Sequence, residues 1–362
     1  MITRRFVIAL ALAAVAWPAA ARAQAGAAPD AHQSLTVGTA TAHRGEKATG
    51  VIHVPAGSDP ALDIPVVVVN GAKPGPVLAL VAGLHGTEYA SIIALEQLIG
   101  RLDPARLSGS VIVVPLVNVP SFEQIVPHVN PYDHKSMNGS YPGKADGTQT
   151  DRASYAMTKE VVDQCDYLID LHGGDIDENL RPYSYLVTTG RADVDRVSRE
   201  MVLAFGIDHI ILADDWPKDP AASRYLHNTA LTRGKPSIAV EAGHSGTVEP
   251  DDVALLVRGC EQVMRYLHIL PGTARSIAHP VWIEKVLTVS GEQPGIFYPL
   301  VARGTYVASG MRVGYVTDFV GRTLQEVRAP AAGVVMFIRA VPSVWKGASL
   351  LDLGVVKEDS QP

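Results

Sequence analysis

Apolar runs typical of buried strands alternate with helical segments through most of the chain, and this alternation restricts the fold more than any other feature. Residues 64–69 and 77–81 are continuous aliphatic or β-branched runs, as expected for strands that are buried on both faces. Residues 88–102 instead carry apolar side chains at helical spacing. Further strands are expected at residues 111–117, 167–171, 183–187, 209–212 and 237–240, and further helices at 151–164, 191–205, 223–233 and 251–268. This order predicts an α/β fold with a mixed, mainly parallel sheet flanked by helices.

The pattern changes at Pro271. After this residue no helical pattern recurs, and short β runs lie between glycine and proline turns up to about residue 356. We therefore predict a small all-β C-terminal domain at residues 271–362, which follows a larger α/β domain at residues 24–270. The length of 362 residues suits about two domains. With 47% apolar and 19% charged residues, the chain can form a sizeable core, which excludes intrinsic disorder.

The N-terminal segment predicts export from the cytoplasm. Two arginines near the start precede a short apolar run at residues 6–17, and Ala21-Arg22-Ala23 fits a small-residue cleavage site. The run is shorter than the ~20 residues needed to cross a bilayer, so we interpret residues 1–23 as a removable signal peptide. General secretion and a twin-arginine route both remain open. We expect a periplasmic or secreted protein with no membrane segment after signal removal.

Charge and cysteine content narrow the function classes. Lys and Arg number 31 and Asp and Glu number 37, which gives a net charge of -6 at pH 7. Because nucleic-acid binding by phosphate neutralisation needs a basic face, we expect no nucleic-acid partner. Cys165 and Cys260 are too few for a disulfide scaffold or a cysteine-based zinc cluster; they can pair or remain buried free thiols. The oligomeric state stays open, a homo-oligomer included.

Polar residues follow three of the predicted strands, at the point where each strand ends. The segments are GLHGTE at residues 83–88, DLHGG at residues 170–174 and SIAVEAG at residues 237–243. Ligands bind open α/β sheets at the edge formed by the carboxyl ends of the strands. The long polar loop at residues 118–150 has the length expected of a functional segment. These segments together predict a site at that edge.

The residue types in the three segments suit hydrolysis assisted by a metal. Two histidines and one carboxylate are a common catalytic zinc set that leaves a position open for water. We predict that His85, Glu88 and His172 bind one zinc ion and that Glu241 acts as the general base. Each of the four residues taken alone also suits a structural role. The prediction rests on their joint occurrence at strand ends beside glycine.

The GLHGTE, DLHGG and VEAG segments, in this order and spacing, resemble those of the succinylglutamate desuccinylase/aspartoacylase family, which belongs to the zinc carboxypeptidase (M14) group. The resemblance covers about residues 35–355. It implies a zinc-carboxypeptidase-like α/β catalytic domain at residues 24–270. It also implies zinc at His85, Glu88 and His172, with Glu241 promoting the attack of water on an amide. Members of the family release a carboxylic acid from an N-acyl amino acid or a related amine.

One departure from the family pattern concerns substrate binding. Family members carry an Asn-Arg pair before an aromatic residue, Pro and Gly, whereas this chain has Asn138 followed by Gly139. In the family that Arg helps to hold the substrate carboxylate, and glycine offers no charge. Residues 118–138 also lack a second Arg that relatives place in this loop. In the relatives, that second Arg resembles the residue that polarises the scissile carbonyl. We predict that Asn138 contacts substrate and that Arg181 substitutes for the missing charge, while His128, His134 and His244 are candidates for lining the cleft.

The sequence therefore favours a secreted zinc-dependent amide hydrolase, a deacylase that cleaves a small N-acyl amino acid or related N-acyl amine. A zinc metallopeptidase that acts on short peptides or cell-wall fragments is the first alternative. A non-catalytic metal-binding protein is the second, suggested by the missing Arg. Glu241 argues against the second alternative, because a pure binding site does not need a free base.

Overall fold

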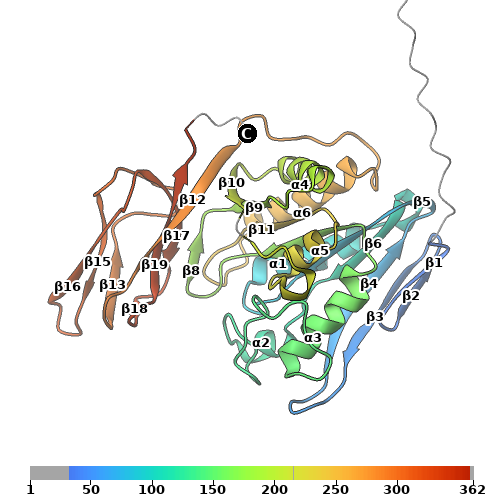
Figure 1. The fold of residues 1–362 in the computed structure, drawn as a ribbon, viewed down its shortest axis with the longest axis horizontal. Helices are drawn as coiled ribbons and strands as arrows, with labels where there is room; N and C mark the ends of the chain where they lie inside the picture. Colours follow the sequence, from blue (N-terminus) through green and yellow to red (C-terminus); the bar gives the residue numbers. More distant parts are fainter. Residues whose placement is uncertain (1–31, 215, 359–362) are drawn as a thin grey trace, which may run out of the picture. The chain divides into compact units, whose positions relative to one another are not determined.

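The computed structural model describes residues 32–214 and 216–358. The predicted signal peptide at residues 1–23 lies outside the described residues. One large mixed sheet of 13 strands organises the described chain, in the order β14-β17-β19-β12-β10-β9-β11-β7-β5-β6-β4-β3, with β8 paired to β17 (Figure 1). Up to residue 241 the strands are β1 (Ser34–Val37), β2 (Ala40–His43), β3 (Lys47–Val54), β4 (Leu62–Asn70), β5 (Lys73–Ala82), β6 (Ser108–Val114), β7 (Tyr167–His172), β8 (Glu178–Leu180), β9 (Tyr183–Val187), β10 (His209–Ala213) and β11 (Ser237–Glu241).

The centre of this sheet is parallel. β11, β7, β5 and β6 pair with one another in parallel, whereas β4 and β3 continue the sheet with antiparallel pairing and β9 is antiparallel to β11. Because β5, β7 and β11 are adjacent and run the same way, their carboxyl ends meet at one edge. The three predicted strand-end motifs therefore come together through the topology of the sheet.

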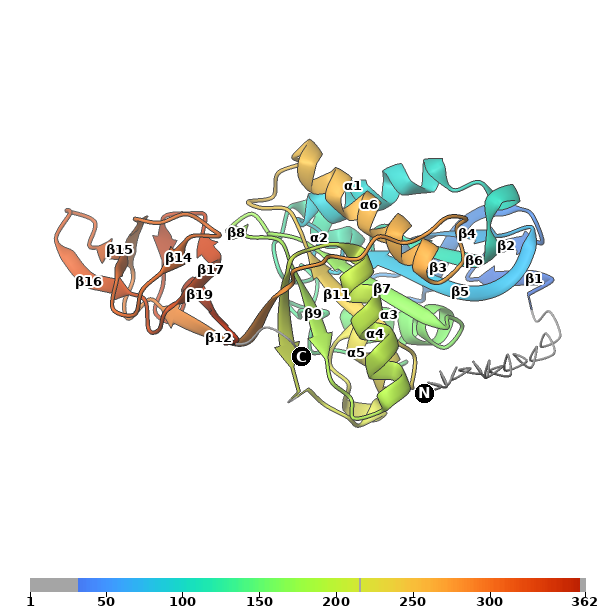
Figure 2. The ribbon, with the colours of Figure 1, turned by 90° about the horizontal axis from the view of Figure 1, so that it is seen from above.

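Helices cover both faces of the sheet. Alternate residues of each central strand point to opposite sides, so each strand contributes to two cores. Leu78 and Leu80 of β5 pack in a core with α1, α4 and α6, whereas Val77 and Ala79 pack in a second core with α3 and α5. Figure 2 shows α1 and α6 lying side by side. Leu78 is fully buried, and burial of such a side chain stabilises a fold by about 1.5–3 kcal/mol. The helices are α1 (Tyr89–Arg101), α2 (Val119–Gln124), α3 (Gln149–Met157), α4 (Ala192–Phe205), α5 (Leu226–Thr232) and α6 (Pro250–Tyr266).

The segment after Pro271 contains strands and no helix among the described residues. These strands are β12 (Val281–Ser290), β13 (Gly295–Pro299), β14 (Tyr306–Val307), β15 (Arg312–Thr317), β16 (Thr323–Arg328), β17 (Gly333–Arg339), β18 (Ser343–Val344) and β19 (Ser349–Val356). β16, β15, β13 and β18 form a separate antiparallel sheet, but β12 pairs in parallel with β10 and extends the large sheet. The large sheet thus continues across residue 271, where a domain boundary stays a prediction.

The structure also describes the loop expected at residues 118–150 and the two cysteines. The expected polar loop at residues 118–150 contains a short helix, α2, whose first turn is capped by the Asn118 side chain. Cys165 and Cys260 are both buried free thiols, so they do not form a disulfide. Within residues 32–214 and 216–358, every helix is too short or too polar to cross a membrane.

Candidate metal centre and active site

The ends of three adjacent strands bring the predicted metal ligands and the predicted base together. His85 lies in the turn between β5 and α1, and Glu88 is the N-cap residue of α1. His172 is the last residue of β7, and it pairs in register with Glu241, the last residue of β11. The strand-end motifs recognised in the sequence therefore lie at one edge of the sheet, as expected.

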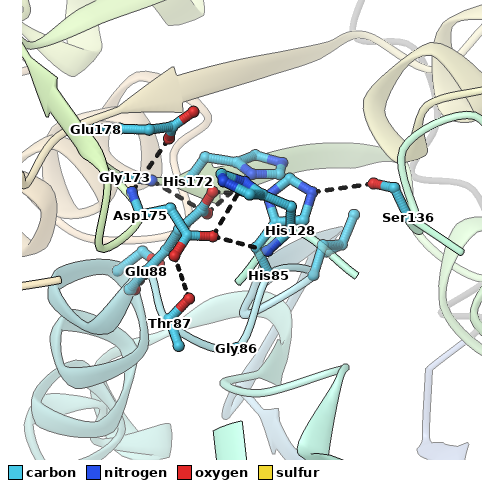
Figure 3. Close-up of polar contacts among 12 residues, drawn as sticks. His85, Gly86, Thr87, Glu88, His128, Ser136, His172, Gly173, Asp175 and Glu178 are labelled. Atoms are coloured by element: carbon cyan, nitrogen blue, oxygen red, sulfur yellow. Dashed lines mark hydrogen bonds and ion pairs between the residues drawn. The ribbon is translucent and has the colours of Figure 1, made fainter. Parts of the chain in front are cut away.

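The side chains of His85, Glu88 and His172 converge on one point (Figure 3). His85 Nδ1 lies 2.6 Å from Glu88 Oε1, and His172 Nδ1 lies 3.0 Å from Glu88 Oε2. One ligand atom from each residue falls within 4.8 Å of the other two, and all three residues are buried. Two imidazole nitrogens and a carboxylate oxygen at these distances fit the donor set of a catalytic zinc site.

Polar groups behind each imidazole fix its orientation. The Nε2 atom of His172 lies 3.2 Å from Asp170 Oδ1, and the other oxygen of Asp170 lies 3.1 Å from His227 Nδ1. On the other ring, His85 Nε2 lies 3.3 Å from Ser136 Oγ. These contacts leave the Nδ1 atom of both rings facing Glu88. Partners of this kind hold metal-binding histidines in position and set their tautomer.

Electrostatics favour a charged Glu88 and a neutral Glu241. Burial raises the pKa of Glu88, but the charges and hydrogen bonds of His85 and His172 outweigh that effect and lower the pKa to about 2. Burial raises the pKa of Glu241 well above its usual range, and the carboxylates of Glu88 and Glu178 add to the increase. A cation held by the two histidines and Glu88 would attract the ionised form of Glu241 and oppose this increase.

Glycine allows the backbone to pack tightly beside the ligands. A Cβ atom on Gly86 would lie 2.2 Å from the backbone nitrogen of Phe122, and one on Gly173 would lie 2.6 Å from the carbonyl oxygen of Ala242. Any larger residue would push these segments apart. The glycines next to His85 and His172 are therefore needed for the geometry of the site, as the sequence indicated.

A cavity of about 220 Å³ opens beside the three predicted ligands. His85, Glu88, Glu241 and Asn138 are among the residues that line it. Its volume is smaller than the roughly 300–1,000 Å³ of pockets for drug-sized molecules. The cavity therefore suits a small molecule better than a peptide chain.

The two predicted substrate-binding residues occupy different places. Asn138 lines the cavity, and no described residue forms a hydrogen bond with its side-chain amide. Gly139 follows at a φ of 99°, and a Cβ atom there would meet nothing within 4 Å. Arg181 is not brought to the cavity: its guanidinium donates to Asp208 and to His209 Nδ1. A role of Arg181 in substrate binding stays a prediction.

His128 lines the cavity. From the sequence it is one of three histidines that we consider as candidates for this position. Its Nδ1 lies 3.2 Å from Asp175 Oδ2 and its Nε2 lies 2.8 Å from Asp177 Oδ1. Burial lowers the pKa of His128, but the Asp177 hydrogen bond and the charges of Asp175, Glu178 and Asp177 outweigh it and raise the pKa to about 9. Asp175 also accepts a short hydrogen bond from Thr87 Oγ1. The sequence signal for this network is the acidic run that directly follows DLHGG.

The C-terminal strands supply part of the cavity wall, which the sequence did not predict. Phe337 of β17 and Ser349 and Asp352 of β19 line the cavity together with Leu180 and Tyr183. The pairing of β8 with β17 holds these strands beside the loop that follows β7. In the sequence the one signal is Asp352, a charged residue inside the otherwise apolar run LLDLG.

The chain is similar in sequence to known proteins. A model of the succinylglutamate desuccinylase/aspartoacylase catalytic domain matches residues 74–267. The N-alpha-acetyl-L-2,4-diaminobutyric acid deacetylase of Halomonas elongata is 29% identical to this chain over 320 residues, which are 85% of this chain and 92% of the deacetylase.

Solved structures share the fold. A succinylglutamate desuccinylase/aspartoacylase from Rhodobacter sphaeroides superposes with a TM-score of 0.76 and 23% identity, over 86% of this chain and 96% of that one. The product-bound ectoine utilization protein EutE (DoeB) from Ruegeria pomeroyi gives a TM-score of 0.77 and 23% identity, over 85% of this chain and 95% of that one. The predicted α/β fold class, with its mixed sheet, flanking helices and C-terminal β region, is confirmed.

The match to the family model spans more than half of the 362 residues and includes the three strand ends that carry His85, Glu88, His172 and Glu241. The chain belongs to the succinylglutamate desuccinylase/aspartoacylase family.

Proposed function

We propose that this protein is a zinc-dependent amide hydrolase that removes the acyl group from a small N-acyl amino acid or related N-acyl amine. The observation that carries the proposal is the convergence of His85, Glu88 and His172 next to the carboxylate of Glu241 in one cavity. Family membership and the similarity to a named deacetylase support amide deacylation. The cavity volume of about 220 Å³ favours a small substrate over a peptide.

His85, Glu88 and His172 are the residues that would hold the zinc ion. When bound, zinc polarises the amide carbonyl and lowers the pKa of a water molecule to about 7. Asp170 and Ser136 keep the two imidazole rings turned so that their Nδ1 atoms face Glu88. The donor set is thereby held ready before any ion arrives, which reduces the cost of organising it.

Glu241 is the proton carrier in this proposal. Its carboxylate lines the cavity and has no hydrogen bond or ion pair with any described residue, so it is free to accept a proton. The attacking water gives one proton to Glu241 as its oxygen bonds to the acyl carbon. Glu241 then delivers that proton to the amide nitrogen as the carbon–nitrogen bond breaks. We propose that Asn138, which lines the cavity, donates its amide hydrogens to a substrate oxygen.

We further propose that the protein works outside the cytoplasm, in the periplasm or as a secreted enzyme. The support is the composition of residues 1–23, with a basic start, an apolar run and a small-residue cleavage site.

The experiment compares Glu241→Gln with the wild-type protein and with Glu96→Gln, which changes an exposed glutamate on α1. We expect Glu241→Gln to retain zinc and the wild-type unfolding temperature but to lose acyl-amide hydrolysis by about 10²–10⁴-fold, the usual contribution of a general base. Glu96→Gln should keep wild-type activity. Full hydrolysis by Glu241→Gln would place the base elsewhere and contradict the proposal.

A further inference from the structure

We propose that the substrate is an N-acylated diamine, whose second amino group is positively charged and lies against Asp352 and Glu178, and that no substrate carboxylate is needed. This inference rests on the proposed amide hydrolysis and specifies the amine that is released. In the reaction, water adds its oxygen to the acyl carbon, the carbon–nitrogen bond breaks, and the leaving nitrogen gains a proton to give the free diamine and a carboxylic acid.

The first observation is the excess of negative charge on the cavity wall. Glu88, Glu178, Glu241 and Asp352 all line it, and none of its lining residues is a lysine or an arginine. A divalent ion would offset Glu88 and one further carboxylate, and the protonated His128, which also lines the cavity, would offset a third. A formal charge of about minus one would remain on the lining, which favours a cationic ligand.

The second observation is Asp352, a half-buried carboxylate without a counter-ion among the described residues. Its Oδ1 accepts a hydrogen bond from Thr288 Oγ1, and no lysine, arginine or histidine of the described chain forms an ion pair with it. Burial raises the pKa of Asp352 above its usual value. A buried charge is costly unless it is paired, so a substrate ammonium group would supply the missing partner.

Glu178 offers a second acceptor. Its Oε2 accepts a hydrogen bond from the Asp175 backbone, and no described residue lies within ion-pair distance of its carboxylate, although the charge of His128 acts on it. Glu178 begins β8, whereas Asp352 lies in β19, so the two carboxylates reach the same cavity from different parts of the fold. An ammonium group has three donors to offer to such acceptors.

The third observation is that the cations near the cavity already have partners. His128 faces Asp175 and Asp177 with its two ring nitrogens. Arg339, which is buried, binds Asp177 and donates to the carbonyl oxygens of residues 343 and 349. At Gly139 there is open space and no side chain. Nothing among the lining residues is therefore available to bind a substrate carboxylate through a planar fork.

The remaining lining side chains suit a short alkyl linker. Leu180, Tyr183 and Phe337 give apolar surface in a cavity of about 220 Å³. A chain of a few methylene groups between the amide and the second amino group would contact this surface while its two ends reach the polar groups.

The first test compares three substrates with the zinc-loaded wild-type protein. N-acetyl-1,4-diaminobutane carries the cation, N-butylacetamide is its neutral counterpart, and N-acetyl-L-aspartate carries two carboxylates. We expect kcat/KM for N-acetyl-1,4-diaminobutane to exceed both others by at least about tenfold, as one buried charge-assisted contact would give. Equal or faster hydrolysis of N-acetyl-L-aspartate or N-butylacetamide would overturn the substrate class and leave the amide hydrolase intact.

The second test changes Asp352. Asp352→Asn keeps an oxygen that can accept from Thr288 but removes the charge, Asp352→Glu retains the charge, and Asp146→Asn changes an exposed aspartate as a matched control. We expect the preference for N-acetyl-1,4-diaminobutane over N-butylacetamide to fall about 10- to 100-fold in Asp352→Asn. Asp352→Glu should recover part of it, and Asp146→Asn should match the wild type. An unchanged preference in folded Asp352→Asn would refute the assignment.

Calorimetry with the product 1,4-diaminobutane separates binding from catalysis. We expect the wild type to bind it and Asp352→Asn to bind at least about tenfold more weakly, with binding reduced by added salt. If all three amides resist hydrolysis but 1,4-diaminobutane binds through Asp352, the proposed function fails and the cation site stands. If 1,4-diaminobutane does not bind, the cation site is refuted whatever the activity.

Discussion

We predict that the contact between Asp170 and His172 strengthens zinc binding. The Asp170 carboxylate is fully buried, with one oxygen 3.2 Å from His172 Nε2 and the other 3.1 Å from His227 Nδ1. Burial raises the pKa of Asp170, but the two histidines outweigh it and hold the pKa well below its usual range. The carboxylate is therefore ionised, and it should increase the basicity of the His172 atom that faces Glu88.

Asp170→Asn keeps the shape of the side chain and removes its charge. Loss of such a partner weakens metal binding by about 10- to 100-fold, which corresponds to about 1.4–2.7 kcal/mol. The structure has a second contact, to His227, so we expect an added loss of unfolding free energy of about 1–3 kcal/mol. Asp146→Asn, at an exposed aspartate in the loop before α3, should change neither quantity by more than about 0.5 kcal/mol.

The assay is zinc titration against a competing chelator, together with urea unfolding of the same samples. The predicted result is a weaker zinc Kd for Asp170→Asn in a protein that remains folded. A zinc Kd within twofold of the wild type, in a folded Asp170→Asn variant, would refute the argument that Asp170 acts through His172.

Three further predictions concern stability. The pKa of His128 is raised to about 9 from 6.5, so its pairing stabilises the fold below pH 6.5 and is lost as the pH rises towards 9. Because the His128 side chain is 41% exposed, screening limits the effect to about 1 kcal/mol; urea unfolding of His128→Gln should differ more from the wild type at pH 6 than at pH 9.5, and an equal difference at both would contradict this. Gly86→Ala places a Cβ atom 2.2 Å from Phe122 N and should cost about 1–3 kcal/mol, whereas Gly100→Ala, where a Cβ atom meets nothing within 4 Å, should not destabilise the fold; equal unfolding midpoints would argue against the close packing. Chelation of zinc should lower the unfolding free energy by about 4 kcal/mol at a zinc concentration 1,000 times Kd, measured by thermal unfolding, and a midpoint indifferent to chelator would contradict metal binding by the native state.

The sequence predicted the central sheet and the strand-end residues because local pattern determines both. Continuous aliphatic runs identify strands buried on two faces, and residues that follow such strands in parallel must meet at one edge. The expected strand at residues 77–81 is the inner part of β5, and the expected helix at residues 88–102 is α1 within one residue at each end. His85, Glu88, His172 and Glu241 follow from the same reasoning.

The parts that the sequence did not predict depend on contacts between distant segments. Asp352 and Phe337 reach the cavity only because β17 pairs with β8 and β19 pairs with β17, and such pairing has no local signal. We predicted substrate binding by Arg181 from its position after DLHGG; the structure pairs its guanidinium with Asp208, and a role in substrate binding stays a prediction. A charged residue near a motif in the sequence can thus be engaged by a neighbour that only the fold brings close.

The central claim is that His85, Glu88 and His172 hold one zinc ion that hydrolysis requires. Its most direct test is metal analysis by mass spectrometry of the purified wild type, of His172→Ala and of His53→Ala, which changes an exposed histidine on β3. The account predicts one zinc ion per chain in the wild type and in His53→Ala, and none in His172→Ala. Stoichiometric zinc in His172→Ala, or its absence from an active wild type, would contradict it.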